Sequence, residues 1–226
     1  MAFPTNGVLD TFDRTAENPL SFGGAWSGPI WNGDPPLSTT GTELQQGTPT
    51  GGDNYWNSTF GADQEAYVTV SGLPGEGKAL AVYLRVQSPG TGSETFIAIV
   101  FNRLAGTDTI IVKIGTAETL KLTVNQDMET GDSFGATVVG TTVTVYYKAS
   151  AGSWGSVGSV DIGASPSGAG YIGIGYWSGD NGILTDNFGG GTLSAGGPSA
   201  GTDTATAGLT ESLNTVSVTL SIRESG

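Results

Sequence analysis

Alternation of apolar and polar residues over short segments constrains the fold of this chain more than any other feature. In segment 78–87 every second residue is apolar and lies on one face of an extended strand: Leu80, Val82, Leu84 and Val86. The same period of two recurs in residues 95–102, 109–115, 118–124, 132–140, 141–148 and 170–177. Each of these segments therefore predicts a β-strand.

Helices are not expected, because no long segment keeps apolar residues three and four positions apart between capping residues. Turn residues separate the alternating segments, and Gly140 stands where a tight hairpin would join two of them. Glycine is abundant, at 38 of 226 residues. Many short strands joined by turns predict an all-β chain folded as a two-sheet antiparallel β-sandwich of the jelly-roll kind.

Composition removes several classes of function. The chain has no cysteine and no histidine, which excludes disulfides, thiolate zinc sites and every catalytic triad with a histidine base. The net charge of −13 opposes binding to nucleic acid or to anionic membranes, and no segment is apolar enough to span a bilayer. The first residues lack the pattern of a secretory signal, so we expect a protein that is intracellular or is exported without a classical signal, for example in a particle released by lysis.

Composition also suggests the domain organisation. We predict a sandwich over residues 1–193, a flexible linker over 194–208 rich in small residues, and a β-strand arm over 209–226. The first sixty residues, rich in Gly and Pro, are expected to form a long loop over one end of the sandwich, with edge strands near residues 43–47 and 54–59. A lone strand is unstable in water, so the arm is expected to dock on a sheet edge through its apolar row: Val216, Val218, Leu220 and Ile222.

The order of these segments resembles a known family. The similar parts are LDTFDR at residues 9–14, a tryptophan-bearing loop, QEAYVTVSG at 64–72 and AGYIGIGYWSGDNGILTDNFGGG at 169–191. In these parts the chain is similar to the concanavalin A-like lectin and glucanase sandwiches, in their laminin-G-like versions. The resemblance covers residues 8–193 and implies a concanavalin A-like sandwich whose first and last strands lie side by side. Phe12 and Phe188 would then be neighbours.

The C-terminal residues carry a second resemblance. GTDTATAGLTESLNTVSVTLSIRESG, residues 201–226, resembles Thr/Ala/Val-rich segments of structural proteins from tailed bacteriophages. It implies a virion protein, assembled in the host cytoplasm, whose partners are other virion proteins and copies of itself.

Carboxylates are the first candidate site. Glucanases of this fold carry three acids on one strand, and retaining hydrolysis needs two carboxyl groups about 5 Å apart. The nearest spacing here is Asp127, Glu129 and Asp132 in DMETGD, which contains Thr-Gly and joins two expected strands. A turn is the better interpretation, and we expect no enzyme.

Aromatic side chains are the second candidate site, because sugar rings stack on exposed Trp and Tyr while polar groups fix the hydroxyls. Burial in the packing of the sheets is the alternative for each of them. Glycines beside Tyr171 and Trp177 leave room around these rings. The candidates for binding bacterial surface glycans are Trp177, Tyr171, Tyr83, Arg85, Trp56 and Asn102.

A cation is the third candidate. The family resemblance implies a structural calcium near the paired terminal strands, with Asp10, Asp13 and Asp186 as its ligands and Asp180 and Asn181 in the adjoining turn. Local capping of turns is the simpler role for these residues. No other cofactor is expected.

Taken together, these features predict a non-enzymatic virion protein of the tail or capsid surface, with a lectin-like sandwich for host glycan attachment or particle decoration. A glycoside hydrolase, with Asp127, Glu129 and Asp132 as its acids, and a free carbohydrate-binding module are the alternatives.

Overall fold

The computed structural model describes residues 2–177 and 182–194. The chain divides into two units, Met1–Leu193 and Ser194–Gly226, and the structure below is that of the first. The predicted strand arm with Val216, Val218, Leu220 and Ile222, and the predicted linker after residue 194, lie outside the described residues.

Short strands account for nearly all regular structure in the described part of the chain. One 3-10 turn, η1 (Phe22–Gly24), accompanies them, and within the described ranges no helix is long and apolar enough to cross a membrane. The strands are β1 (Val8–Asp10), β2 (Trp26–Ser27), β3 (Ser38–Thr39), β4 (Leu44–Gln45), β5 (Gly51–Trp56), β6 (Gln64–Gly72), β7 (Ala79–Gln87), β8 (Thr95–Asn102), β9 (Thr109–Ile114), β10 (Thr119–Asn125), β11 (Ser133–Val139), β12 (Thr142–Lys148), β13 (Gly155–Asp161), β14 (Tyr171–Trp177) and β15 (Leu184–Thr192).

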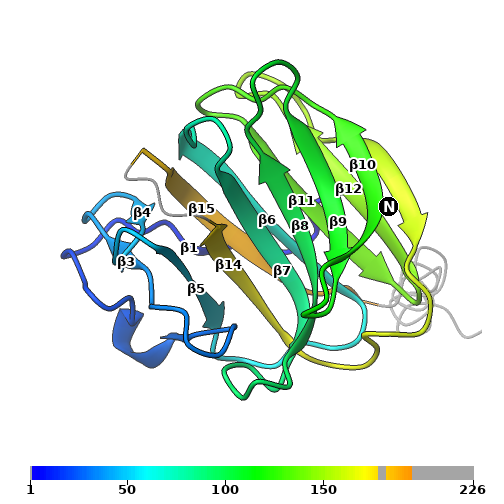
Figure 1. Cartoon of the computed structure of the whole chain (residues 1–226), viewed down its shortest axis with the longest axis horizontal. Coiled ribbons are helices and arrows are strands. Elements are labelled where there is room, and N and C mark those ends of the chain that lie inside the picture. The colour runs from blue at the N-terminus through cyan, green and yellow to red at the C-terminus, as the bar shows by residue number, and fades with distance from the viewer. Residues whose placement is uncertain (1, 178–181, 195–226) are drawn as a thin grey trace, which may run out of the picture. The chain divides into compact units, whose positions relative to one another are not determined.

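Two antiparallel sheets form the layers of a sandwich (Figure 1). The eight-stranded sheet has the order β13-β12-β11-β6-β15-β4-β3, and β1 pairs with β15 as well. The seven-stranded sheet has the order β10-β9-β8-β7-β14-β5-β2. The predicted all-β, two-sheet antiparallel sandwich is confirmed.

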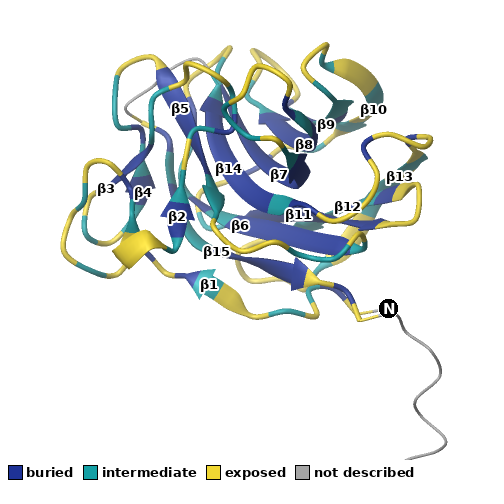
Figure 2. Cartoon of the chain, turned by 90° about the horizontal axis from the view of Figure 1, so that it is seen from below, coloured by how far each residue is buried: buried dark blue, intermediate teal, exposed yellow. Residues whose placement is uncertain are grey.

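The main core lies between the two sheets (Figure 2). Alternate residues of β7 and β8, such as Val82 and Ile99, face alternate residues of β11 and β12, such as Phe134 and Val145, and all four are fully buried. The period of two in the sequence thus marks the inward face of each strand, as expected for a sandwich.

The two ends of the sandwich domain meet, as predicted. β1 pairs with β15 antiparallel, with Val8 opposite Gly189 and Asp10 opposite Phe188. The ring of Trp26 on β2 lies 6.1 Å from that of Phe12 and 5.0 Å from that of Phe188. This aromatic contact closes the sandwich where the terminal strands lie side by side.

The expectation of a long N-terminal loop was wrong in part. The first sixty residues contain β1 to β5, and β5 lies inside the seven-stranded sheet between β14 and β2 rather than at its edge. Gly52 makes this placement possible. Its φ of +145° favours glycine, and a Cβ at this residue would lie 2.3 Å from the carbonyl oxygen of Pro35, so a side chain has no space there.

The predicted face of Val86 was also wrong. Arg85 has a φ of 48°, and the pairing of β7 with β14 and β8 shifts register beside it. A bulge of this kind inserts a residue and moves the following side chain to the opposite face. Val86 therefore packs with Tyr83 on the outer face of the sheet, whereas Leu84 stays in the main core.

Candidate functional site

A second apolar cluster covers the outer face of the seven-stranded sheet. Its buried members come from β7, β8 and the loop after β2, and its partly buried members include Trp31, Tyr55, Tyr171 and Trp177. The phenol of Tyr83 is fully buried at the centre of this cluster. Its ring centroid lies 5.2 Å from that of Phe96, which lies 5.0 Å from that of Trp31.

Trp177 is held firmly at the end of β14. Its Nε1–H donates to the hydroxyl of Tyr83 at 2.5 Å, and the ammonium of Lys113 lies 4.9 Å from the centroid of its ring. Lys113 in turn forms a 2.8 Å ion pair with Glu118. Burial and the carboxylate of Asp53 raise the pKa of Tyr83 well above its ordinary value, so the phenol stays neutral and accepts this hydrogen bond.

A hollow of about 460 Å³ opens beside these rings, and we call it the aromatic hollow. Two tryptophans from distant parts of the chain, Trp31 and Trp177, lie in its wall together with two carboxylate side chains. Its lining is Trp31, Asp34, Thr50, Glu118, Tyr176 and Trp177. An aromatic wall beside a few polar groups is the common composition of small-ligand sites.

Buried carboxylates fix the loop that carries Trp31. Asp53 on β5 accepts the backbone N–H groups of Ile30 at 2.5 Å and of Trp31 at 3.2 Å. Glu94 accepts the backbone N–H of Asn32 at 3.1 Å. Burial raises the pKa of Asp53 to about 7, and the nearby carboxylates of Asp34 and Glu94 contribute to the rise.

The pKa of Asp34 in the hollow is raised as well, first by partial desolvation of its carboxyl group and then by the charge of Glu94. The sequence alone did not single out Trp31, Asp34, Asp53 or Glu94. The signal available was the segment GPIWNGDPP at residues 28–36, where one tryptophan stands between turn residues. Only the tertiary structure places that loop over β14.

The predicted sugar-stacking residues separate into different environments. Tyr171 shares the outer face with Trp177 and packs against Tyr55 at 4.7 Å between ring centroids. Trp56 packs on the main core, 5.4 Å from the ring of Trp26. Asn102 ends β8 opposite Ala79 and is partly exposed.

Arg85 is buried among backbone carbonyls. Its guanidinium donates to the carbonyl oxygens of Ala62 at 2.7 Å, Pro166 at 3.0 Å and Gly140 at 2.7 Å, and only 2% of the residue is exposed. These contacts tie the β11–β12 hairpin to β7. In this structure Arg85 joins loops together and does not line the aromatic hollow.

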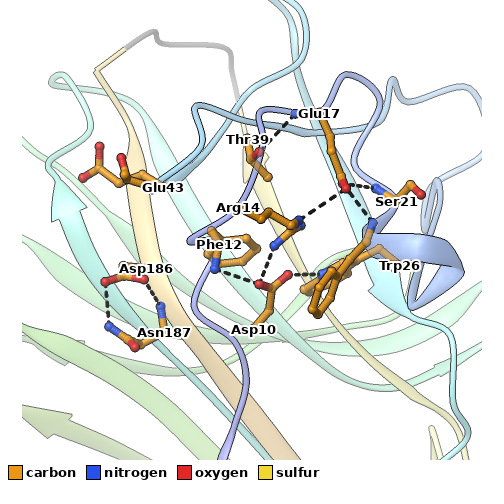
Figure 3. Close-up of polar contacts among 12 residues, drawn as sticks. Asp10, Phe12, Arg14, Glu17, Ser21, Trp26, Thr39, Glu43, Asp186 and Asn187 are labelled. Carbon is orange, nitrogen blue, oxygen red and sulfur yellow. Dashed lines mark hydrogen bonds and ion pairs between the residues drawn. The ribbon is translucent and has the colours of Figure 1, made fainter.

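Of the predicted calcium ligands, Asp10 and Asp186 each bind their own protein donors (Figure 3). Asp10 is buried and accepts from the backbone N–H of Phe12 at 2.7 Å, from Arg14 at 2.6 Å and from Nε1 of Trp26 at 2.6 Å. Asp186 accepts instead from the amide groups of Asn187, and Asp13 is exposed.

Burial raises the pKa of Asp186, and the carboxylates of Asp13, Glu43 and Asp10 add to the rise. Across the described residues, no group of three or more acidic side chains is arranged to hold a metal ion. The turn residues Asp180 and Asn181, also predicted for this site, lie outside the described residues. The carboxylate of Asp10 is occupied by protein donors, which suits a structural role.

The three candidate catalytic acids lie in the connection between β10 and β11, which is a turn as the sequence indicated. Asp132 is buried, and it accepts from the hydroxyl of Tyr147 at 2.7 Å and from the backbone N–H groups of Glu129 and Ser150, both at 2.9 Å. Asp127 and Glu129 are exposed and line a separate hollow of about 270 Å³.

Comparisons with known proteins identify the fold. No family profile matches the chain, and no curated protein sequence is similar to it. Solved structures do match. The exoplasmic/lumenal domain of VIP36 with bound calcium and Man2 has a TM-score of 0.57 and 15% identity, over 87% of this chain and 91% of that domain.

Two further structures give the same result. The metal-free form of the VIP36 domain has a TM-score of 0.55 and 14% identity, over 84% of this chain and 92% of that one. A Bacillus subtilis protein of unknown function with a galectin-like fold has a TM-score of 0.53 and 9% identity, over 78% of this chain and 94% of that one. The chain has a lectin-like sandwich fold.

Proposed function

We propose that this sandwich binds glycans through the aromatic hollow, without catalysis. The observation that carries the proposal is the pair of tryptophans, Trp31 and Trp177, in the wall of one hollow with the carboxylates of Asp34 and Glu118 and the hydroxyl of Thr50. Sugar rings pack their C–H faces on aromatic rings, and carboxylates accept hydrogen bonds from sugar hydroxyls. The sugar-bound VIP36 domain, which has the same fold, supports the proposal.

The charge of the hollow indicates which sugars fit. Asp34 and Glu118 are its charged lining residues, and the whole chain carries a net charge of −13. Glu118 is paired with Lys113, whereas Asp34 forms no ion pair with any described residue. The carboxylate of Asp34 and the net charge of the chain would oppose binding of carboxylated or sulfated sugars. We therefore expect neutral hexoses at this site.

Calorimetric titration of neutral oligosaccharides, selected on a glycan array, tests the proposal. Trp177→Ala should weaken binding by about tenfold or more, since an aromatic contact is worth about 0.5–1.5 kcal/mol beyond the area it buries. Asp34→Ala, at an exposed position, should also weaken it while leaving the packing of Trp177 intact. Phe22→Ala, at an exposed aromatic residue that lines neither this hollow nor the others, is the matched control. The proposal is wrong if no neutral glycan binds or if both hollow variants bind like the parent.

Binding without hydrolysis is the form that the acid geometry favours, because the carboxylate of Asp132 is occupied by three protein donors. Incubation of the parent protein with its glycan should release no reducing sugar. Release that disappears in Asp127→Asn or Glu129→Gln variants would instead support the glycoside hydrolase alternative.

We also propose that the chain is a virion component, attached through its C-terminal residues. The support is the resemblance of residues 201–226 to segments of phage structural proteins. Immunogold labelling of purified particles should place the protein on the tail or the capsid surface. Absence of label from particles, with free protein in the lysate, would leave a free carbohydrate-binding module as the better description.

A further inference from the structure

A larger hollow, of about 710 Å³, lies against the eight-stranded sheet near its β13 edge. We call it the lysine hollow. β12 supplies alternate residues Thr144, Tyr146 and Lys148, which lie on the face opposite its core residues Val143 and Val145. The lining is Ala2, Phe3, Thr144, Tyr146, Lys148, Gly152, Ser153, Trp154 and Ser156. Figure 2 shows β12 and β13 together at this end of the molecule.

Three aromatic rings form one wall of the lysine hollow. The rings of Phe3 and Tyr146 stack with their centroids 4.1 Å apart and their planes 6° apart. Trp154 packs edge-on against Phe3 at 4.8 Å and against Tyr67 at 5.8 Å. Tyr146 and Trp154 remain partly exposed. Each ring is fixed by its neighbours, so a ligand would meet a preformed aromatic surface.

The N-terminal segment completes this wall and is itself held in place. Glu65 on β6 accepts from the backbone N–H of Thr5 at 2.7 Å and from Nδ2 of Asn6 at 2.9 Å. The hydroxyl of Tyr67 donates to the carbonyl oxygen of Asn6 at 3.2 Å. A Cβ at Gly189 would lie 2.3 Å from the ring of Tyr67, so glycine at this position leaves room for the ring.

Charge distinguishes the two hollows. Lys148 is the charged member of the lysine hollow's lining, and its ammonium forms no ion pair or hydrogen bond with any residue that the structure describes. The aromatic hollow carries Asp34 and Glu118 instead. Lys78, Arg103 and Lys121 also form no ion pair with any described residue, so Lys148 is distinguished by the aromatic wall beside it and not by the lack of a partner. A partly buried lysine beside an aromatic wall matches a ligand with one anionic group and an apolar ring face.

We propose that the lysine hollow is a second glycan-binding site, selective for a sugar that carries a carboxylate, such as a hexuronate. The sugar ring packs on Trp154 and Tyr146, its carboxylate pairs with Lys148, and the hydroxyls of Thr144, Ser153 and Ser156 bond to its hydroxyl groups. The site is on the other sheet from Trp177, so this proposal can fail while the proposed function stands, and the reverse holds as well.

A matched pair of ligands tests this site in the full-length chain. A trimer of galacturonic acid and its methyl ester differ in the charge of the carboxyl groups and in one methyl group on each. Calorimetric titration should show tighter binding of the acid, and the preference should weaken as salt rises. Lys148→Gln should reduce affinity for the acid by about fivefold, as expected for a partly exposed ion pair, and leave affinity for the ester unchanged.

Variants locate the binding and control for unfolding. Trp154→Ala should reduce affinity for both trimers, whereas Trp177→Ala should leave binding of the acid unchanged. Lys78→Gln, at another partly exposed lysine before β7, is the control for net charge. The proposal is overturned if the acid and the ester bind with equal affinity. It is also overturned if the Lys78 and Lys148 variants lose affinity for the acid equally, or if the Trp177 variant alone loses affinity. Equal competition by inorganic sulfate would also overturn it, because it would indicate a non-selective anion contact.

Discussion

At the scale of single residues, Asp53 shows how the candidate site depends on one buried carboxylate. It carries the two backbone hydrogen bonds that hold Ile30 and Trp31 against the sheet, and it lies near two other acids, Asp34 and Glu94. Burial raises its pKa from 3.8 to about 7. The charge of the Asp53 carboxylate is therefore unfavourable at this buried position. Its oxygens nevertheless accept the hydrogen bonds that order the loop carrying Trp31 of the aromatic hollow.

This raised pKa predicts a pH dependence of stability. Between about pH 4 and pH 7 the folded state holds a proton on Asp53 that the unfolded state has lost, so its contribution to the free energy of unfolding falls as the pH rises through this window. The fall is at most about 1.4 kcal/mol per pH unit. Urea unfolding at several pH values should show a shallower fall in Asp53→Asn than in the parent, and parallel curves would contradict the assignment.

At the scale of elements, the pairing of β1 with β15 depends on Asp10. The strand β1 has three residues, too few to be held by its ladder alone. Asp10 adds contacts to Phe12, Arg14 and Trp26 that join β1 to the following loop and to β2. This network of protein donors joins the first strand to the residues around it.

Removing the carboxylate should therefore be costly. Asp10→Ala removes the acceptor of one Arg14 nitrogen and of the indole N–H of Trp26, while Arg14 keeps its 3.4 Å ion pair with Glu17. We expect the free energy of unfolding to drop by about 2–4 kcal/mol, since each buried donor left unpaired costs about 1–3 kcal/mol. Asp13→Ala, at an exposed position three residues later, should change it by less than about 0.5 kcal/mol. Urea denaturation of both variants checks this, and similar small losses in both would show that the network contributes little.

At the scale of the whole molecule, the sandwich is closed by residues that all precede the C-terminal unit. Every described strand pair lies between Val8 and Thr192, and the main core draws on residues from Phe12 to Phe188. The sandwich thus contains its own core and both of its terminal strands. Under the two proposals, glycan binding belongs to the sandwich and attachment to a particle belongs to the C-terminal residues.

Truncation separates these two parts. A chain ending at residue 194 should unfold at the same temperature as the full chain, within about 2 °C, and keep its glycan affinity, because no described contact of the sandwich is removed. Under the virion proposal the truncated chain should lose incorporation into particles. Unchanged incorporation, measured by blotting purified particles, would contradict docking through residues 195–226, and a large drop in melting temperature would contradict the independence of the sandwich.

The sequence by itself determined the fold class. A strand buried on one face must alternate apolar and polar residues, and the strands of Val82 and Val143 show this alternation whatever strands they pack against. The sequence also determined the pairing of the terminal strands, through the resemblance of the segments around Phe12 and Phe188 to one family. The alternation with a period of two also placed Tyr83 and Trp177 on one outer face, opposite the core residues of their strands.

Only the tertiary structure decided what covers each face. The bulge at Arg85 reverses Val86, and it depends on carbonyl groups of three distant loops that bind one guanidinium. Trp31 joins Trp177 because Asp53 holds a loop of no regular pattern. Phe3 meets Tyr146 because Glu65 holds the N-terminal segment. Periodicity reports burial along one strand, whereas both hollows arise from contacts between segments far apart in the chain.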